Sequence, residues 1–156
     1  MDSADETATA WPPWHGTTLS LSIEGVPVAK GRPRLGRNGH VYTPAKTQAA
    51  ERSVRAQIQR QLRDVTGSVF AAVERGPVRV WVDFYLPIPA SWSRKRAAEA
   101  MRLGSHFGRP DLDNFIKLFL DAANGVLWRD DSQLSQLVAR KMYTQDIPRT
   151  TIVMEW

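Results

Sequence analysis

The sequence predicts a single small domain of the α/β (α+β) class, in which a mixed β-sheet packs against two main helices. Two kinds of segment predict it: some have alternating apolar residues, as in half-buried strands, and others have apolar residues at helical spacing. They alternate along the chain, which is typical of a mixed sheet. A length of 156 residues supports one hydrophobic core but is too short for two domains.

The chain begins with a segment that we expect to lie outside the fold. Residues 1–16 show no periodicity and are predicted to form a disordered arm, followed by a domain at residues 17–156. Apolar side chains then alternate with polar ones over residues 19–23. This period of two predicts the first strand, near residues 17–25.

A basic loop and a helix follow this strand. Glycine and proline interrupt residues 30–39 and predict an irregular loop, in which four cations occupy eight positions: Lys30, Arg32, Arg34 and Arg37. Thr43 is predicted to cap the next helix, with Pro44 at its first position. Helix-compatible residues then continue to about residue 64.

The middle of the chain holds a second strand and a basic connector. Alternating apolar residues predict a strand over residues 77–86, which Pro87 ends. The connector spans residues 87–110 and is predicted to contain a short helix after Ser93. Its cations outnumber its single acid, Glu99; they are Arg94, Lys95, Arg96, Arg102 and Arg109.

The clearest helix lies in the last third of the chain. Over residues 112–124, apolar residues fall at positions i, i+3, i+4, i+7, i+8 and i+11, and Gly125 follows. Two strands are predicted after it, at residues 133–143 and 149–156. Because their connection is short, we expect these two strands to pair as a hairpin.

Composition limits the chemistry that the chain can perform. It has no cysteine, and its three histidines, His15, His40 and His106, form no metal-binding pair, so any metal must be held by oxygen. Without a membrane-length apolar run or a secretory signal, we expect a cytoplasmic protein with no membrane partner. The formal charge of +5 rises to about +8 without the arm, and this favours a polyanionic partner.

Five of the 16 acidic residues lie between positions 111 and 131. One interpretation is structural: Asp111 caps the helix, and Asp113 and Asp121 pair with Lys117 on its wet face. The other is a metal site. An N-cap Asp111 has non-helical dihedral angles, so it can converge with Asp113 at the helix start. Asp131 would then be brought in by the return of the chain after the helix.

The second interpretation predicts a definite chemistry. Carboxylate oxygens without histidine or cysteine suit Mg²⁺ or Mn²⁺. Lys117, one turn after Asp113, can orient the attacking water or stabilise the negative charge that develops on the phosphorane. The flanking basic segments predict phosphate contacts from Lys30, Arg32, Arg34, Arg37, Arg94, Lys95, Arg96 and Arg109. A metal site with a basic rim indicates phosphodiester cleavage.

Further motifs accompany the acidic cluster. They are Lys30-Gly31-Arg32-Pro33-Arg34, Tyr42-Thr43-Pro44, the turn from Leu86-Pro87 to Ser91-Trp92-Ser93, Pro110-Asp111-Leu112-Asp113-Asn114 with Lys117, Asp121-Ala122-Ala123-Asn124-Gly125, Trp128-Arg129-Asp130-Asp131-Ser132-Gln133, and Arg140-Lys141. In this combination the chain resembles the RusA-type Holliday junction resolvases over roughly residues 19–156. The block from Asp111 to Gln133 is the most specific part.

The resemblance implies a homodimeric, Mg²⁺-dependent endonuclease that resolves four-way junctions by paired nicks in recombination and repair, and that phages and prophages often carry. The family's essential aspartates fall on Asp111, Asp113 and Asp131, and its lysine falls on Lys117. Two other functions stay open. One is cleavage of other branched DNA, such as flaps or forks; the other is DNA binding without catalysis, against which these four intact residues argue.

Other side chains near the cluster stay outside the predicted catalytic set. Asp130 can assist or be a turn acid, and Asp121 is expected to be structural. Asp83 lies on the polar face of its strand, which favours a surface role over that of a further metal ligand. Trp92 and Trp128 can stack on unpaired bases, but tryptophans near helix ends are more often packing residues.

Overall fold

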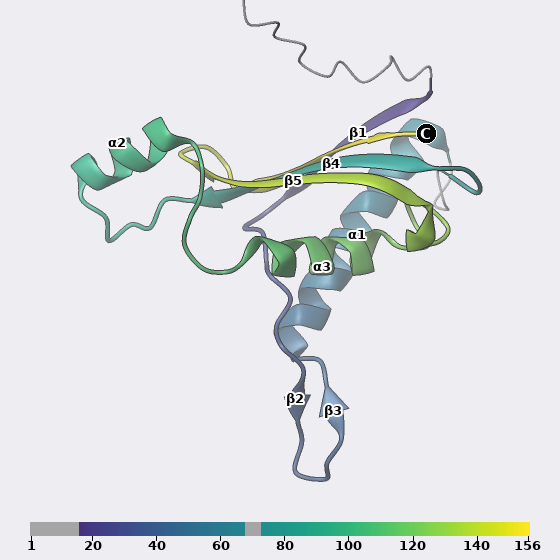
Figure 1. The fold of residues 1–156 in the computed structure, drawn as a ribbon, viewed down its shortest axis with the longest axis horizontal. Coiled ribbons are helices and arrows are strands. Elements are labelled where there is room, and N and C mark those ends of the chain that lie inside the picture. The colour runs from purple at the N-terminus through teal and green to yellow at the C-terminus, as the bar shows by residue number, and fades with distance from the viewer. Residues whose placement is uncertain (1–15, 68–72) are drawn as a thin grey trace, which may run out of the picture.

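The computed structural model describes residues 16–67 and 73–156, so the arm predicted for residues 1–16 lies outside the described part except for its last residue. The elements follow one another in the order β1 (Thr18–Glu24), β2 (Arg34–Leu35), β3 (Val41–Tyr42), α1 (Ala45–Thr66), β4 (Val78–Pro87), α2 (Arg94–Leu103), α3 (Leu112–Ala123), the 3₁₀ turn η1 (Asp131–Gln133), β5 (Leu134–Thr144) and β6 (Arg149–Glu155) (Figure 1).

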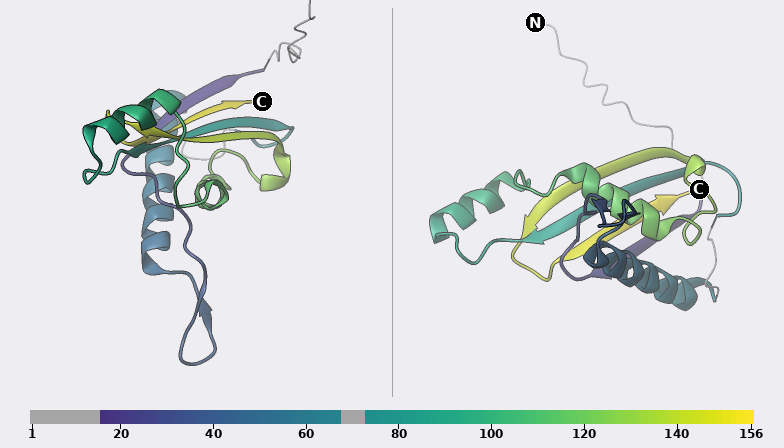
Figure 2. Two further views of the ribbon diagram at one scale, coloured as in Figure 1. Left: turned by 60° about the vertical axis from the view of Figure 1, so that its left-hand side comes forward. Right: turned by 90° about the horizontal axis from the view of Figure 1, so that it is seen from below.

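Four of the strands form one mixed sheet in the order β1-β6-β4-β5. Strand β6 runs antiparallel to both of its neighbours, whereas β5 runs parallel to β4. Helices α1 and α3 lie on one side of this sheet, and α2 lies beyond one end of it and contacts β5 (Figures 1 and 2). The predicted α+β class with a mixed sheet and two main helices is confirmed, and α2 is a third, peripheral helix.

The hydrophobic core lies between the sheet and these two helices. Side chains alternate along β4, so that Val80 and Val82 are buried while Trp81 is half-buried on the other face. Phe115 on α3 packs against Phe84 on β4, with ring centroids 5.2 Å apart. The buried face of the strand and the apolar face of the helix therefore pack together, as the sequence predicts.

The predicted terminal hairpin is wrong. Strands β5 and β6 are consecutive in sequence, but β4 lies between them and pairs with both. The connection at residues 145–148 therefore passes the end of β4 instead of forming a hairpin turn. The physical reason is burial: β4 has a fully buried face from Val78 to Leu86 and takes a central place, whereas β5 is only partly buried along most of its length and forms an edge.

The basic loop also differs from its prediction. Its residues Arg34 and Leu35 form β2, which pairs antiparallel with β3 just after the loop, with Arg34 opposite Tyr42 and Leu35 opposite Val41. This β2–β3 hairpin, residues 34–42, extends away from the sheet and from the helices (Figure 1). Strands of two residues have no periodicity for a sequence pattern to reveal.

Two of the three predicted helix starts are confirmed. Asp111 is the N-cap of α3, with the extended dihedral angles φ −70° and ψ 146°. Ser93 caps α2, and its side chain accepts a hydrogen bond from the Arg96 amide. For α1 the prediction is wrong by one residue, because Pro44 and not Thr43 occupies the N-cap position.

Candidate active site

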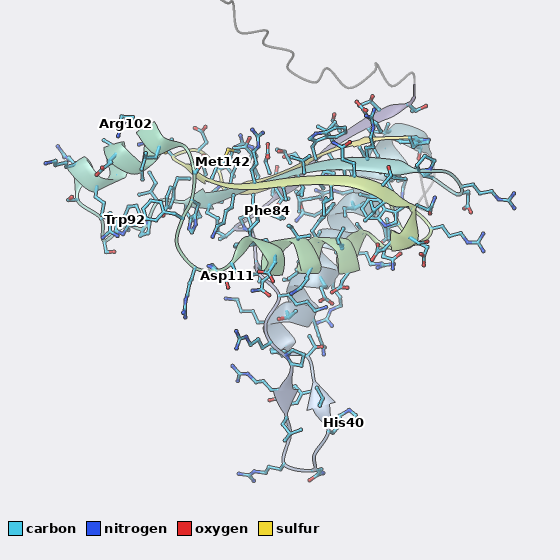
Figure 3. The ribbon with its side chains drawn as sticks, viewed as in Figure 1. His40, Phe84, Trp92, Arg102, Asp111 and Met142 are labelled. Atoms are coloured by element: carbon cyan, nitrogen blue, oxygen red, sulfur yellow. The ribbon has the colours of Figure 1, made fainter. Side chains whose placement is uncertain are left out.

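Two of the predicted catalytic carboxylates lie together at the start of α3. Asp111 stands at the end of this helix that is nearer to α2 (Figure 3), and its carboxylate makes no capping hydrogen bond. Asp113 follows in the first turn and accepts a hydrogen bond of 2.9 Å from Lys117 Nζ; both side chains are 60% exposed. The hydrogen bond from Lys117 lowers the pKa of Asp113 from its ordinary value, so this carboxylate is ionised at neutral pH.

The third carboxylate, Asp131, is placed differently. The structure does not bring it to the start of α3, and no group of three acidic or histidine side chains within residues 16–67 and 73–156 could hold a metal ion. A helix of 12 residues is about 18 Å long, and Asp131 follows its far end. Asp131 Oδ1 accepts a hydrogen bond of 2.7 Å from Trp128 Nε1, and Trp128 is buried against Phe119. This packing anchors Asp131 beside the C-terminal half of α3, so the predicted intrachain convergence is wrong.

A lysine that composition alone does not distinguish fixes the backbone before Asp111. Lys141 on β5 donates hydrogen bonds to the carbonyl oxygens of Gly108, at 2.5 Å, and of Pro110, at 2.8 Å. Its own carbonyl oxygen accepts a hydrogen bond of 2.9 Å from the His106 amide. Lys141 therefore ties the segment that leads into α3 to the sheet. The sequence signals it only as part of the Arg140-Lys141 motif, without a role.

His106 reinforces this attachment. Its ring packs on Tyr143 of β5, with centroids 4.5 Å apart, and its Nδ1 is buried without a hydrogen-bond partner among the described residues. Burial lowers the pKa of His106, and the nearby charge of Lys141 lowers it further. A neutral imidazole is therefore the form that this packing favours.

The predicted DNA-binding cations fall into two groups. Lys30 is tied into the fold, because it pairs with Asp121 and lies 3.9 Å from Glu51. The predicted structural role of Asp121 agrees with this, although its partner is Lys30 and not Lys117. The other seven cations are exposed, on the β2–β3 hairpin or its base, on α2, and directly before α3: Arg32, Arg34, Arg37, Arg94, Lys95, Arg96 and Arg109.

Comparison with known proteins identifies the family of this chain. The family model described as Endodeoxyribonuclease RusA matches residues 24–155. The chain belongs to the RusA endodeoxyribonuclease family. A Bacillus subtilis (strain 168) protein named "Uncharacterized protein YqaN" is 34% identical to the chain over 142 residues, which are 87% of the chain and 94% of that relative. Membership of the RusA family makes this protein a nuclease of the class that acts on branched DNA such as Holliday junctions.

Several side chains of this RusA-family chain have structural roles. Trp128 is fully buried, so it packs and does not stack on bases. Trp92 packs edge-on against Tyr143, with ring centroids 5.3 Å apart, and beneath the Arg96 guanidinium. Asp130 caps η1, where hydrogen bonds from Ser132 lower its pKa.

Asp83 is not a further ligand beside Asp111. It accepts two hydrogen bonds, of 2.8 and 2.7 Å, from the Arg140 guanidinium on the neighbouring strand β5. Neighbouring side chains of a strand point to opposite faces, and Phe84 faces α3, so Asp83 faces away from that helix. Asp83 is therefore a polar residue of the sheet face that pairs with Arg140.

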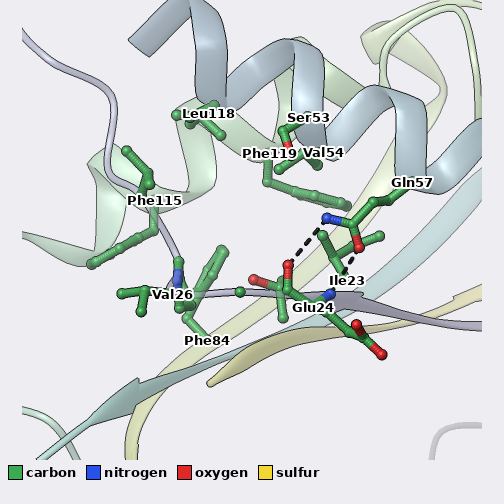
Figure 4. Close-up of a pocket in the computed structure, with 15 residues that line it drawn as sticks. Ile23, Glu24, Val26, Ser53, Val54, Gln57, Phe84, Phe115, Leu118 and Phe119 are labelled. Carbon is green, nitrogen blue, oxygen red and sulfur yellow. Dashed lines mark hydrogen bonds between the residues drawn. The ribbon is translucent and has the colours of Figure 1, made fainter. Parts of the chain in front are cut away.

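An apolar pocket lies between the sheet and the helices α1 and α3. Ile23, Val54, Phe84, Phe115 and other apolar side chains line it, between the end of β1, the following segment, α1 and α3 (Figure 4). At its rim, Gln57 forms two hydrogen bonds with the backbone of Glu24. None of the predicted catalytic residues lines this pocket. The side chains of Asp111, Asp113 and Lys117 are instead exposed on the surface, where a large substrate such as DNA can reach them.

In the described residues no helix is long and apolar enough to cross a membrane.

Proposed function

We propose that this chain is a Mg²⁺-dependent, structure-selective endodeoxyribonuclease that resolves Holliday junctions by paired nicks. The observation that carries the proposal is the exposed group of Asp111, Asp113 and Lys117 at the start of α3, in a chain of the RusA family. Exposed arginines and Lys95 lie on the β2–β3 hairpin and its base, on α2 and directly before α3. Carboxylates within a cationic surface suit a phosphodiester, because the cations hold the phosphates while the acids serve the reaction.

Carboxylate oxygens fit Mg²⁺, but the two carboxylates at the start of α3 do not make a complete metal site by themselves. Asp111 and Asp113 would hold the ion through hard carboxylate oxygens, which Mg²⁺ prefers. A bound Mg²⁺ would supply Lewis-acid activation of the scissile phosphodiester. Lys117 lowers the pKa of Asp113, and its ammonium can stabilise the negative charge that develops on the phosphate oxygens.

A homodimer would supply the missing ligand. Because Asp131 lies at the far end of α3, it could join Asp111 and Asp113 only from a second protomer. A two-fold axis that sets the two α3 helices antiparallel would form two such sites at once. Two sites match the two opposed strands that must be cut in a four-way junction. The dimer therefore explains both the separation of the carboxylates within one chain and the paired nicks.

The proposal is tested by incubating the purified protein with a synthetic four-way junction, a flap, a fork and a linear duplex of the same length, each with Mg²⁺ or with EDTA. We expect symmetric nicks in the junction with Mg²⁺, none with EDTA, and far slower cutting of the other substrates. Asp113→Asn should abolish the nicks, whereas Asp64→Asn, at an exposed position near the end of α1, should not. Faster cutting of flaps or forks would replace this proposal with the branched-DNA alternative. Binding without any cutting, in Mg²⁺ or Mn²⁺, would indicate a non-catalytic module.

A further inference from the structure

The β2–β3 hairpin exposes side chains that a small protein normally buries. Leu35 is 73% exposed, Val41 59% and Tyr42 46%. An isolated two-stranded hairpin is marginally stable in water, because it has no hydrophobic face covered by other elements. The described part of the chain leaves these three side chains uncovered, and a binding partner would bury them.

The register gives the hairpin two chemically different faces. Residues directly opposite in an antiparallel pair share a face, so Arg34 lies beside Tyr42 and Leu35 lies beside Val41. The first face offers a cation and an aromatic ring, which suit a phosphate and the flat surface of a base. The second face is aliphatic and suits only an apolar surface.

Charge identifies the class of partner. Between Glu24 and Glu51 the chain has no acidic residue and five cations: Lys30, Arg32, Arg34, Arg37 and Lys46. Such a segment favours a polyanion and disfavours a basic or neutral protein surface. A nucleic acid with exposed base faces is both anionic and apolar, whereas an intact duplex hides its base faces by stacking. The partner surface that fits both faces of the hairpin is the branch point of a DNA junction.

The base of the hairpin is held against the candidate active site. The Lys30 amide donates a 2.8 Å hydrogen bond to the carbonyl oxygen of Asn114 in the first turn of α3, and the Lys30 ammonium pairs with Asp121. The Gly31 amide donates to the buried Thr47 hydroxyl at 3.0 Å, and a Cβ atom on Gly31 would lie 2.9 Å from that oxygen. The hairpin is therefore fixed relative to the start of α3.

A groove connects the β2–β3 hairpin with the start of α3. Its lining includes Arg32, Arg34 and Lys46 from the hairpin side and Pro110, the residue before Asp111. A DNA strand lying in this groove would have its backbone against these three cations on the hairpin side. The hairpin would then contact the DNA strand at a fixed distance from the phosphate that lies at Asp111 and Asp113.

We propose that the β2–β3 hairpin inserts into the branch point of the junction. Tyr42 stacks on a base that has left the DNA stack, and Arg34 contacts the adjacent phosphate. Leu35 and Val41 form an aliphatic wedge against the neighbouring base pair. This inference rests on the proposed function, since it names how the same site recognises branched DNA. It assigns substrate selection to the hairpin and cleavage to the start of α3.

The test uses a four-way junction with 2-aminopurine at the branch point, in EDTA so that no strand is cut. The wild-type protein should raise the fluorescence, because a 2-aminopurine that loses its stacked neighbour to Tyr42 is brighter. Tyr42→Ala and the double variant Leu35→Ser with Val41→Ser should lose most of this increase, and Tyr42→Ala should weaken junction binding by roughly 5- to 150-fold, the range for loss of one base–aromatic stack. Tyr42→Phe should retain both.

The matched control is Ile147→Ser, which removes an equally exposed aliphatic side chain, 72% exposed, from the β5–β6 connection. Its signal should equal that of the wild type, and thermal unfolding should show that every variant is folded. An unchanged fluorescence increase in the hairpin variants would overturn the inference. So would a hairpin variant that sediments as a smaller species than the wild type, because the hairpin would then be a contact between two copies of the chain. The experiment needs no cleavage, so a protein that unstacks the base without cutting would retain this inference and lose the proposed nuclease function.

Discussion

The ammonium of Lys141 lies 2.8 Å from the carbonyl oxygen of Pro110, the residue directly before Asp111. A second hydrogen bond joins it to the carbonyl oxygen of Gly108. An edge strand of the sheet thereby fixes the backbone that presents the first candidate metal ligand, so Lys141 is a positioning residue for Asp111.

Replacing Lys141 with methionine is expected to lower kcat for junction cleavage by on the order of 100-fold, because a misplacement of about 1 Å at a reacting group can have that effect. The KM should change little, since the cationic surface remains. Lys141→Arg, which keeps the charge and the donors, should recover part of kcat. The control is Arg140→Met on the same strand, whose guanidinium pairs with Asp83 on the opposite face. Equal losses of kcat in Lys141→Met and Arg140→Met would show a general effect of strand stability and not a positioning role.

Conversion of Asp111, Asp113 or Asp131 to asparagine should abolish cleavage and leave junction binding unchanged or tighter. Each change removes a proposed metal ligand and also one negative charge from a surface that binds phosphate. Gel-shift titration in EDTA measures binding, and strand cleavage in Mg²⁺ measures activity, with Asp64→Asn as the control. A variant with full activity would show that its aspartate is not a ligand.

The two groups of cations should respond differently to alanine. Arg32→Ala and Arg34→Ala should each flatten the dependence of log K on log salt by up to roughly 0.9, the value for one lost phosphate contact on duplex DNA. Lys30→Ala should have a smaller effect on this slope and lower the free energy of unfolding by up to about 1 kcal/mol, because Lys30 pairs with Asp121. Binding at several salt concentrations and urea unfolding separate the two effects. An unchanged slope in both arginine variants would assign their segment to folding or to contacts between subunits.

His106 gives the fold a dependence on pH. Its pKa in the folded protein is below the ordinary value, so the unfolded chain binds a proton more readily. The contribution of His106 to the free energy of unfolding should therefore be complete above the unfolded pKa of about 6.5 and decline as the pH falls below it. Urea unfolding at about pH 8 and pH 5.5 measures the difference, which should be smaller in His106→Phe than in the wild type. The same pH dependence in both proteins would contradict the assignment to His106.

The parts of the fold and site that depend on near neighbours in sequence could be predicted. The apolar stripe of α3 and the position of Asp111 before it determine the helix start and its extended cap. The pairing of Asp113 with Lys117 follows from one turn of helix. Predicting these features requires no knowledge of the residues that pack against them.

Features that depend on distant residues could not be predicted. The alternation in β5 and β6 shows which side chains are buried but not that β4 separates the two strands. The place of Asp131 depends on the packing of Trp128 against Phe119, and the contacts of Lys141 cross from β5 to the segment before α3. A lysine or an aspartate in an alternating pattern carries no sign of such a partner.

The most direct test of the dimeric nuclease is cleavage of a supercoiled plasmid with an extruded cruciform by a mixed dimer, in which one protomer carries Asp113→Asn and the other Asp131→Asn. The two chains are co-expressed with different affinity tags and purified through both. Neither homodimeric variant should cut, and the wild type should give a linear product. If Asp131 of one protomer joins Asp111 and Asp113 of its partner, the mixed dimer has one intact site and one doubly altered site, so it should convert the plasmid to a nicked circle. A mixed dimer as inactive as either homodimeric variant, beside an active wild type, would contradict the shared site.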